Sequence, residues 1–535
     1  MNVGALCDGA TAARLRVDWL LAELEPISEY GRERFRDQQP FASGEQSAAQ
    51  EHAERIAAIA KRDVERLDAV REALRELPEI RPAVSRARLG ATLVDADFWT
   101  LLRFCETAQQ LASAVDSTIV REPIVPGTRL LEALSTGKSD GFAFYLSDRF
   151  SETLAKKRHE LQRAESRLEA SRAKLAHEVA AALDRPEIAT DQFIVMRDEL
   201  RGEVPRGVHV IREAATYLLC ELELDEVALD ALQERDRCAT AVATAEQDVR
   251  KDLSALVSEF GDALEQIAAQ AGNIDVLVAA ARYTQRYDCV VPAFEADTTL
   301  RFTDARFLPL QHELALKDRR YVPITAALER ANAFTGPNMG GKTAVLSTAG
   351  FLAFGAAFGL PVPAKDASLA LFNRIQWLGV GTEAEGDDGQ LLSSFAREVV
   401  RLRDMLQEPR RALWLIDEFA HTTSPDQGQA LQLAVLERLR DRDDCALAAT
   451  HLSIFGLRDG VAHFVVGALR NGGSPVQFGG TDEALRALAQ RMDYGVRRVR
   501  ESPQNTSDAI ELAELLGLDK ELVQSAKEML ARCNR

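Results

Sequence analysis

The first part of the chain is dominated by apolar positions spaced three and four residues apart. Between Glu51 and Leu77 the apolar side chains recur at helical spacing, and the intervening Ala, Glu and Arg favour helix as well. Prolines at 78 and 82 interrupt the pattern, which then resumes up to Leu102. The sequence therefore predicts that residues 1–150 form a mostly helical core. The spaced positions are Ile56, Ile59, Val64, Leu67, Val70 and Leu74.

A seven-residue repeat of leucine follows at positions 154, 161, 168 and 175, and a second apolar seam runs from Val242 to Phe260. Between the seams, Asp191–Met196 and Val208–Leu219 read as strands around a turn-like segment. We predict an antiparallel coiled-coil arm over residues 151–270 with a small β tip near 186–224. Residues 271–300 would return to the core. Two unrelated amphipathic helices remain the alternative interpretation.

From about residue 301 to 500, short apolar strands alternate with helices and glycine-rich turns, which indicates an α/β domain with a mainly parallel sheet. Residues 501–535 are helical again. The expected fold class is therefore mixed α and α/β.

The amino-acid composition of the chain limits the classes of protein to which it could belong. The chain has 535 residues, enough for about three domains, and 65 basic against 83 acidic residues give a net charge of −18. That balance excludes a basic nucleic-acid footprint over the whole molecule, although a local groove could exist. Seven scattered cysteines without a C-x-x-C pair, no apolar run of roughly 20 residues and no signal peptide lead us to expect a cytoplasmic protein without a membrane span.

The strongest chemical motif is a glycine-rich loop that fits the pattern G-x-x-x-x-G-K-[ST]. It follows an apolar strand and opens a helical run, so its backbone N–H groups can surround phosphates. Lys342 would reach the β- and γ-phosphates, and Thr343 would offer its hydroxyl to Mg²⁺. The motif consists of Gly336, Pro337, Asn338, Met339, Gly340, Gly341, Lys342 and Thr343.

Two further predicted strands end in polar residues. Leu413–Ile416 leads into Asp417 and Glu418, where Asp417 would hold Mg²⁺ and Glu418 would orient or deprotonate the attacking water. Cys445–Ala449 leads into Thr450 and His451, and His451 would sense the γ-phosphate. The alternative for His451 is an ordinary core or surface histidine.

These motifs resemble the nucleotide site of the MutS family, a branch of the ABC-type ATPases. The resemblance is carried by Thr335–Thr343 (TGPNMGGKT), Asp417–Gly428 (DEFAHTTSPDQG), Ala449–His451 (ATH) and, more loosely, Gln390–Glu398 (QLLSSFARE). It implies a P-loop ATPase domain that uses ATP and Mg²⁺. It also implies a homodimer in which Ser393 completes the partner's site. Tyr321 lies in the sequence where the family has an aromatic residue that stacks on adenine.

Weaker similarity extends upstream and downstream. Leu77–Leu102 resembles the family's core, Val204–His209 its clamp tip, and Ala509–Leu530 its C-terminal dimerisation helices. The resemblance thus implies a helical core with a coiled-coil lever and a small β clamp tip, followed by the ATPase domain and a dimerisation element at 501–535. Core-like sequence by residue 77 leaves no room for a mismatch-reading domain. His421-Thr422 stands where the family usually has Arg-Gly, which puts the coupling between sites in doubt.

The sequence supports two hypotheses for what the predicted clamp binds. The first hypothesis is DNA of unusual structure, in a repair or recombination setting. The second is a protein client, because the architecture also resembles the MutS-like ATPase subunits that reactivate adenosylcobalamin-dependent lysine or ornithine aminomutases. The acidic balance and the mixed charge of residues 197–212 slightly favour the second hypothesis, and the breadth of the family favours the first.

Overall fold

The computed structural model divides the chain into two compact units. Unit 1 comprises Met1–Arg75, Ser113–Pro123 and Ala269–Arg535, and unit 2 comprises Glu76–Ala112 and Ile124–Ala268. The predicted domain limits at 150, 270, 300 and 500 stay predictions. The structure describes residues 1–123, 125–138, 143–188, 190, 192–200, 202–337, 341–379, 394–421, 423–450, 460–469, 492–499, 510 and 518–533.

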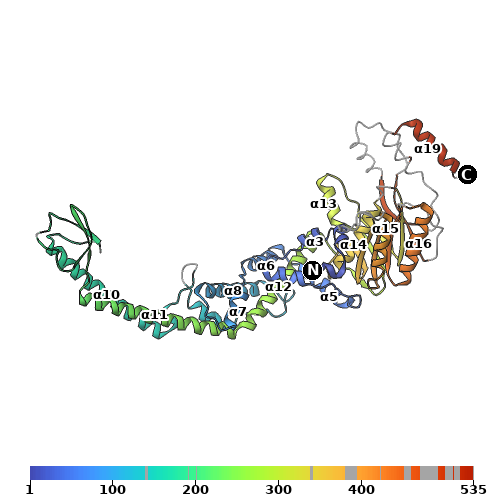
Figure 1. Cartoon of the computed structure of the whole chain (residues 1–535). Helices are drawn as coiled ribbons and strands as arrows, with labels where there is room; N and C mark the ends of the chain where they lie inside the picture. Colours follow the sequence, from blue (N-terminus) through green and yellow to red (C-terminus); the bar gives the residue numbers. More distant parts are fainter. Residues whose placement is uncertain are drawn as a thin grey trace. The chain divides into compact units, whose positions relative to one another are not determined.

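Unit 2 contains a pair of long helices that lie side by side, α10 (Glu152–Ala182) and α11 (Glu226–Glu259) (Figure 1). The predicted seam positions Leu154, Leu168 and Leu175 are buried, whereas Leu161 and Leu256 are half-buried. The remaining helical elements of this unit are α7 (Arg81–Arg88), most of α8 (Asp95–Ala114), α9 (Thr128–Ser135) and the short 3₁₀ turn η1 (Asp148–Phe150).

A three-stranded antiparallel sheet joins the two long helices, in the order β1 (Gln192–Met196), β3 (Tyr217–Leu222), β2 (Val208–Glu213). The second predicted strand is thus two strands, since Ala214–Thr216 turns the chain back on itself. One face of the sheet, with Phe193, Val195 and Leu218, packs on the end of α10. The role of this arm and its tip as a lever and clamp stays a prediction.

Unit 1 holds two sheets. The six-stranded sheet has the order β13-β12-β7-β11-β10-β9, in which only β13 is antiparallel to its neighbour. A four-stranded sheet has the order β4-β8-β5-β6. The strands are β4 (Ala293–Glu295), β5 (Leu300–Ala305), β6 (Ile324–Leu328), β7 (Ala331–Thr335), β8 (Asp366–Ala370), β9 (Arg374–Gly379), β10 (Ala412–Asp417), β11 (Cys445–Ala449), β12 (Ala462–Leu469) and β13 (Met492–Val499).

Strand β11 and strand β10 up to Ile416 are apolar and buried, as expected for parallel strands covered on both faces. On one face Trp414, Ile416 and Ala448 form a core with α15 (Ser394–Met405) and α16 (Pro425–Asp441). On the other face lies α14 (Lys342–Ala357), almost all of whose residues are buried. The mixed α and α/β class predicted from the sequence is confirmed.

The other helices of unit 1 are α1 (Val3–Leu6), α2 (Gly9–Arg14), α3 (Val17–Glu23), α4 (Glu29–Asp37), α5 (Gln46–Ala60), α6 (Val64–Glu76), α12 (Gly261–Arg286), α13 (Leu308–Leu316) and α19 (Lys520–Cys533). Helices α6 and α12 each cross the boundary between the units by sequence. Among the described residues, no helix is both long and apolar enough to cross a membrane.

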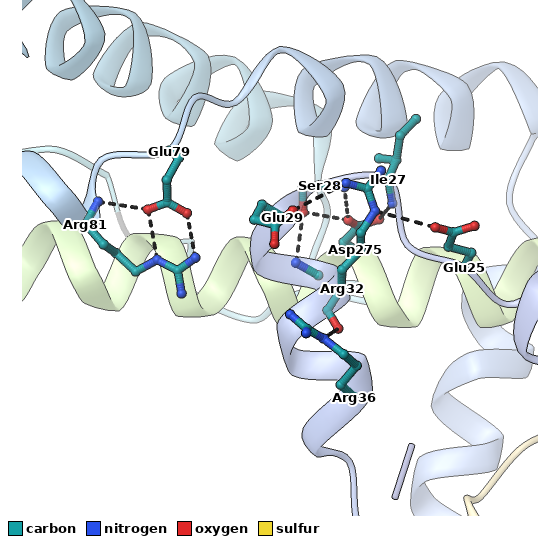
Figure 2. Close-up of polar contacts among 10 residues, drawn as sticks. Glu25, Ile27, Ser28, Glu29, Arg32, Arg36, Glu79, Arg81 and Asp275 are labelled. Atoms are coloured by element: carbon teal, nitrogen blue, oxygen red, sulfur yellow. Dashed lines mark hydrogen bonds and ion pairs between the residues drawn. The ribbon is translucent and has the colours of Figure 1, made fainter. Parts of the chain in front are cut away.

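A buried carboxylate fixes the start of α4 onto α12 within unit 1 (Figure 2). Asp275 accepts hydrogen bonds from the backbone N–H groups of Ile27 (3.2 Å) and Ser28 (2.7 Å), and from the Ser28 hydroxyl (2.6 Å). Ser28 in turn accepts from the N–H of Gly31 and so caps the helix. Burial raises the pKa of the Asp275 carboxyl, and the hydrogen bonds from Ser28 oppose that shift.

Gly31 is required by this arrangement, because a Cβ there would overlap Oδ2 of Asp275. Gly31→Ala should lower the free energy of unfolding by about 1–3 kcal/mol, the usual cost of forcing an extra carbon into a packed site. Gly9→Ala is the matched control, since Gly9, like Gly31, lies in the first turn of a helix and its Cβ would meet open space. Thermal unfolding of both variants measures the difference, and equal melting temperatures would contradict the packing argument.

Candidate nucleotide-binding site

Three neighbouring parallel strands of the six-stranded sheet end at the same level. The register pairs Phe334 of β7 with Ala449 of β11, and Ala449 with Asp417 of β10. The N–H of Thr450 donates to the Phe334 carbonyl (2.9 Å), and the N–H of Glu418 donates to the Ala449 carbonyl (3.0 Å). The motifs that follow these strands are therefore brought to one edge of the sheet, where open α/β sheets bind ligands.

The glycine-rich loop after β7 lies against β12. Gly336 has a φ of +144°, and a Cβ there would overlap the Val466 carbonyl oxygen, so only glycine fits. Gly341 has a φ of +96° and is the N-cap of α14. The loop thus delivers the chain to a helix N-terminus, where N–H groups without helical partners can bind an anion. Asn338, Met339 and Gly340 lie outside the described residues.

Lys342, the first residue of α14, is buried at 5% exposure. Its Nζ donates to the carbonyl oxygens of Gly336 (2.8 Å) and Pro337 (3.2 Å), so the side chain folds back over the loop. Burial lowers the pKa of Lys342 to about 8, against the opposing effect of the carboxylates of Glu418 and Asp417. The ammonium is thus a poorly solvated cation held at the place where the loop would receive phosphates.

Thr343 and Asp417 lie in contact. The Thr343 hydroxyl donates to Asp417, with its Oγ1 3.1 Å from Oδ2 and 3.3 Å from Oδ1. Burial raises the pKa of Asp417, whereas the Thr343 hydrogen bond and the cations Arg14 and Lys342 lower it. A hydroxyl and a carboxylate are oxygen donors that suit Mg²⁺. The donor set therefore fits the metal that the sequence predicts here.

The loop after β10 is strained and firmly held. Glu418 and Ala420 have φ values of 60° and 59°, in the left-handed region that non-glycine residues rarely adopt. The N–H of Ala420 donates to the buried carboxylate of Glu398 on α15 (2.9 Å), and Gln432 of α16 donates to the Phe419 carbonyl. Two helices thus support the backbone that places Glu418.

Comparison with known proteins agrees with this geometry. Residues 332–534 match the family model described as MutS domain V. Residues 332–534 are therefore similar to domain V of the MutS family.

Several relatives carry the name Endonuclease MutS2. The protein of Thermomicrobium roseum is 29% identical over 542 residues, covering 90% of this chain and 63% of the relative. The protein of Geobacillus thermodenitrificans is 29% identical over 352 residues, covering 64% and 41%. That of Geobacillus sp. (strain WCH70) is 24% identical over 484 residues, covering 85% and 57%. The chain thus spans about 41–63% of the length of these MutS relatives.

The structure gives less information on the remaining predicted site residues. His451 and Ser393 lie outside the described residues. The Tyr321 hydroxyl accepts a hydrogen bond from the N–H of Phe307 (2.9 Å), and burial raises the pKa of the Tyr321 phenol. Its hydroxyl is therefore anchored in the fold. Stacking of its ring on adenine stays a prediction.

Two residues near this site were not predicted from the sequence. Tyr494 of β13 lies beside the phosphate loop, with its Cδ1 3.6 Å from the place of a Cβ on Gly341. Arg14 acts electrostatically on Asp417 from the N-terminal helix α2. Both are far along the chain from the motifs that they approach. No local pattern marks them, and only the tertiary fold brings them to the site.

Asn332 is a fully buried polar residue of β7, and it has a structural role. Its Oδ1 accepts from the N–H of Glu329 (2.9 Å), while its Nδ2 donates to the carbonyls of Glu329 (2.5 Å) and Ala446 (3.2 Å). The side chain thereby closes the turn between β6 and β7 and joins it to β11. Asn332 fixes the strand that leads into the phosphate loop.

Gly336→Ala tests whether the loop needs its observed path. Because the added methyl would overlap the backbone of Val466, we expect at least a roughly tenfold loss of affinity for a fluorescent ATP analogue, the size of a strained loop costing 1–3 kcal/mol. Gly355→Ala in α14 is the control, because a Cβ there meets no atom closer than 4.0 Å. Wild-type affinity in Gly336→Ala would show that the loop binds nucleotide in another conformation.

Proposed function

We propose that this chain is a Mg²⁺-dependent ATPase of the MutS family that acts on DNA. The observation that carries the proposal is the meeting of the phosphate loop, Thr343, Asp417 and Glu418 at the carboxyl edge of one sheet. The relatives named Endonuclease MutS2 support the assignment to a family that works on DNA. The proposed nucleotide site would carry out ATP hydrolysis, and cleavage of DNA is not part of the proposal.

The proposed reaction is attack of water on the γ-phosphate. Lys342 would exchange its bonds with the Gly336 and Pro337 carbonyls for phosphate oxygens, where its charge offsets the charge that develops on them. Thr343 and Asp417 would hold Mg²⁺, which neutralises phosphate charge when bound. Glu418, supported by its loop, would orient the water and accept its proton.

The dimer is part of the proposal. Ser393 of one subunit would complete the site of the other, His451 would sense the γ-phosphate, and closure of the two sites would move the arm of unit 2. His421 is placed to affect this coupling, because its Nδ1 lies 3.2 Å from the carbonyl oxygen of Glu418. The unusual residue of this loop therefore contacts the backbone of the proposed catalytic glutamate.

A row of cations on α10 supports DNA as the target. Lys156, Arg163, Arg167 and Lys174 recur at spacings of seven, four and seven residues, which places them along one face of the helix. All four are exposed, and Lys156, Arg163 and Arg167 form no ion pair with any residue that the structure describes. By contrast, Arg158 is paired with Asp148 and Glu246. Exposed cations that follow one another along a helix suit contact with a phosphate backbone. Glu160, between Lys156 and Arg163, interacts electrostatically with both and offsets part of their charge.

Glu418→Gln should bind ATP with unchanged affinity and lower its turnover by roughly a hundredfold or more, the usual contribution of a general base. Binding of a fluorescent ATP analogue and release of phosphate measure the two effects separately. Glu65→Gln, at an exposed position in α6, is the control and should keep full turnover. Full turnover in Glu418→Gln would remove Glu418 from the mechanism.

DNA binding is tested by fluorescence anisotropy with duplex and branched DNA, with and without ATP, across a salt series. We expect saturable, ATP-sensitive binding whose affinity falls steeply with salt. The double variant Arg163→Gln/Arg167→Gln should reduce the slope of log affinity against log salt by about two, one for each lost phosphate contact. Glu226→Gln on α11 is an exposed control on the other helix.

Absent or salt-independent binding by a chain that hydrolyses ATP would overturn the DNA target and leave the ATPase standing. That result would direct attention to a protein client such as an aminomutase. The relatives named above give this second hypothesis no support.

A further inference from the structure

His463 lies in β12, the strand next to β7, and β7 leads into the phosphate loop. The residue is buried, with 4% of its surface exposed. Its Nε2 lies 2.8 Å from the hydroxyl oxygen of Thr335, the last residue of β7 and the one directly before Gly336. Its Nδ1 forms no hydrogen bond with any residue that the structure describes. The contact with Thr335 thus joins the two strands at the point where the loop begins.

A second contact joins the same two strands on the opposite face of the sheet. The ring of Phe334, next to Thr335, stacks on the ring of Phe464, next to His463, with their centroids 5.3 Å apart. Successive side chains of a strand point to opposite faces, so the two phenylalanines and the Thr335–His463 pair lie on different faces. The end of β7 is therefore held against β12 on both faces of the sheet.

Strand β12 also limits the path of the loop itself. The Val466 carbonyl occupies the space that a Cβ on Gly336 would need, and Cγ1 of Val466 lies 3.9 Å from the place of a Cβ on Gly341. These two glycines of the loop therefore pass close to β12. A shift of β7 relative to β12 would change the path that the loop can take.

The Thr335–His463 pair does not depend on charge. Burial lowers the pKa of His463, which favours the neutral imidazole. A neutral imidazole and a hydroxyl can each donate or accept a hydrogen bond, so the pair forms between two uncharged groups. Its contribution is therefore a matter of geometry.

We propose that His463 and Thr335 are positioning residues of the phosphate loop, and that their hydrogen bond holds the end of β7 against β12 in the loop path that binds nucleotide. This inference rests on the proposed ATPase function. Without the bond, the loop populates other paths, and the affinity for nucleotide falls with the fraction of molecules that keep the binding path. Because the pair carries no net charge, the loss of affinity is the same at low and high salt.

The experiment uses the full chain with Thr335→Val, Thr335→Ser, His463→Leu and the double variant Thr335→Val/His463→Leu. Valine has the shape of threonine without its hydroxyl, serine keeps the hydroxyl, and leucine lacks the imidazole nitrogens. The probe is a fluorescent ATP analogue with MgCl₂, read by anisotropy at low and high salt. We expect a loss of affinity of about fivefold for each of the two single removals and for the double variant, the size of one hydrogen bond. Thr335→Ser should stay within about twofold of wild type.

Thr284→Val is the matched control, because this buried threonine of α12 also loses a hydroxyl hydrogen bond, to the Ala280 carbonyl in its own helix (2.9 Å). It should bind the probe normally. Release of phosphate at saturating ATP should stay within about twofold of wild type in every variant, since bound nucleotide restores the loop path. The expected change is thus in KM and not in kcat.

Wild-type affinity in both Thr335→Val and His463→Leu would overturn the inference and leave the ATPase proposal intact. Losses that multiply in the double variant would mean that the two residues act separately, and a full loss in Thr335→Ser would mean that the hydroxyl is not the cause. Either result also overturns the inference, as does an equal loss in Thr284→Val, which would indicate general destabilisation. No binding by the wild-type chain would overturn the ATPase proposal and this inference together.

Discussion

The proposed nucleotide site depends on a balance of opposite charges in a place where burial disfavours charge. Lys342, Asp417 and Glu418 come together at the carboxyl edge of the sheet. Burial lowers the pKa of Lys342 and raises the pKa of Asp417, so it favours the neutral form of each. Each charged group lowers the cost of burying its opposite. Three features hold these groups close together. They are the strands that end at the same edge of the sheet, the glycines of the loop, and the helices that support the backbone of Glu418.

This balance also explains why the supporting backbone is so constrained. Glu418 adopts a left-handed conformation, and Gly336 tolerates no side chain. Such conformations persist only where surrounding contacts determine them. Here those contacts come from Glu398, Gln432 and the β12 backbone. The site is therefore a property of the whole sheet with its covering helices, more than of the motifs alone.

Sequence reasoning found what local pattern encodes. The loop from Gly336 to Thr343, the strand ends at Asp417 and Thr450, and the apolar seams of α10 and α11 all have a periodicity or spacing that a reader can recognise. It missed what depends on distant contacts. It also missed one local turn. The segment predicted as one strand, Val208–Leu219, forms two strands, and the turn between them could not be recognised because it contains no glycine or proline.

The assignment of the N-terminus shows the same limit. Residues 1–15 look like any short amphipathic stretch, and nothing in them announces that Thr11 and Leu15 pack on strands more than 300 positions away. The role of Asn332 could not be predicted for the same reason, since its partners Glu329 and Ala446 are fixed only by the turn and the neighbouring strand. Long-range packing leaves no periodic trace in the sequence.

The hydrogen bond between Trp377 of β9 and Thr11 of the N-terminal helix α2 has a consequence for folding during synthesis. Thr11 leaves the ribosome 366 residues before its hydrogen-bond partner Trp377. At roughly 5–20 residues per second, the first helices wait about 20–70 seconds for their strand. During that interval Leu6, Leu15 and Leu20, all buried in the finished fold, have no sheet to cover. The first helices therefore expose these leucines until β9 emerges, and the proposed nucleotide site cannot form before β10 has been made.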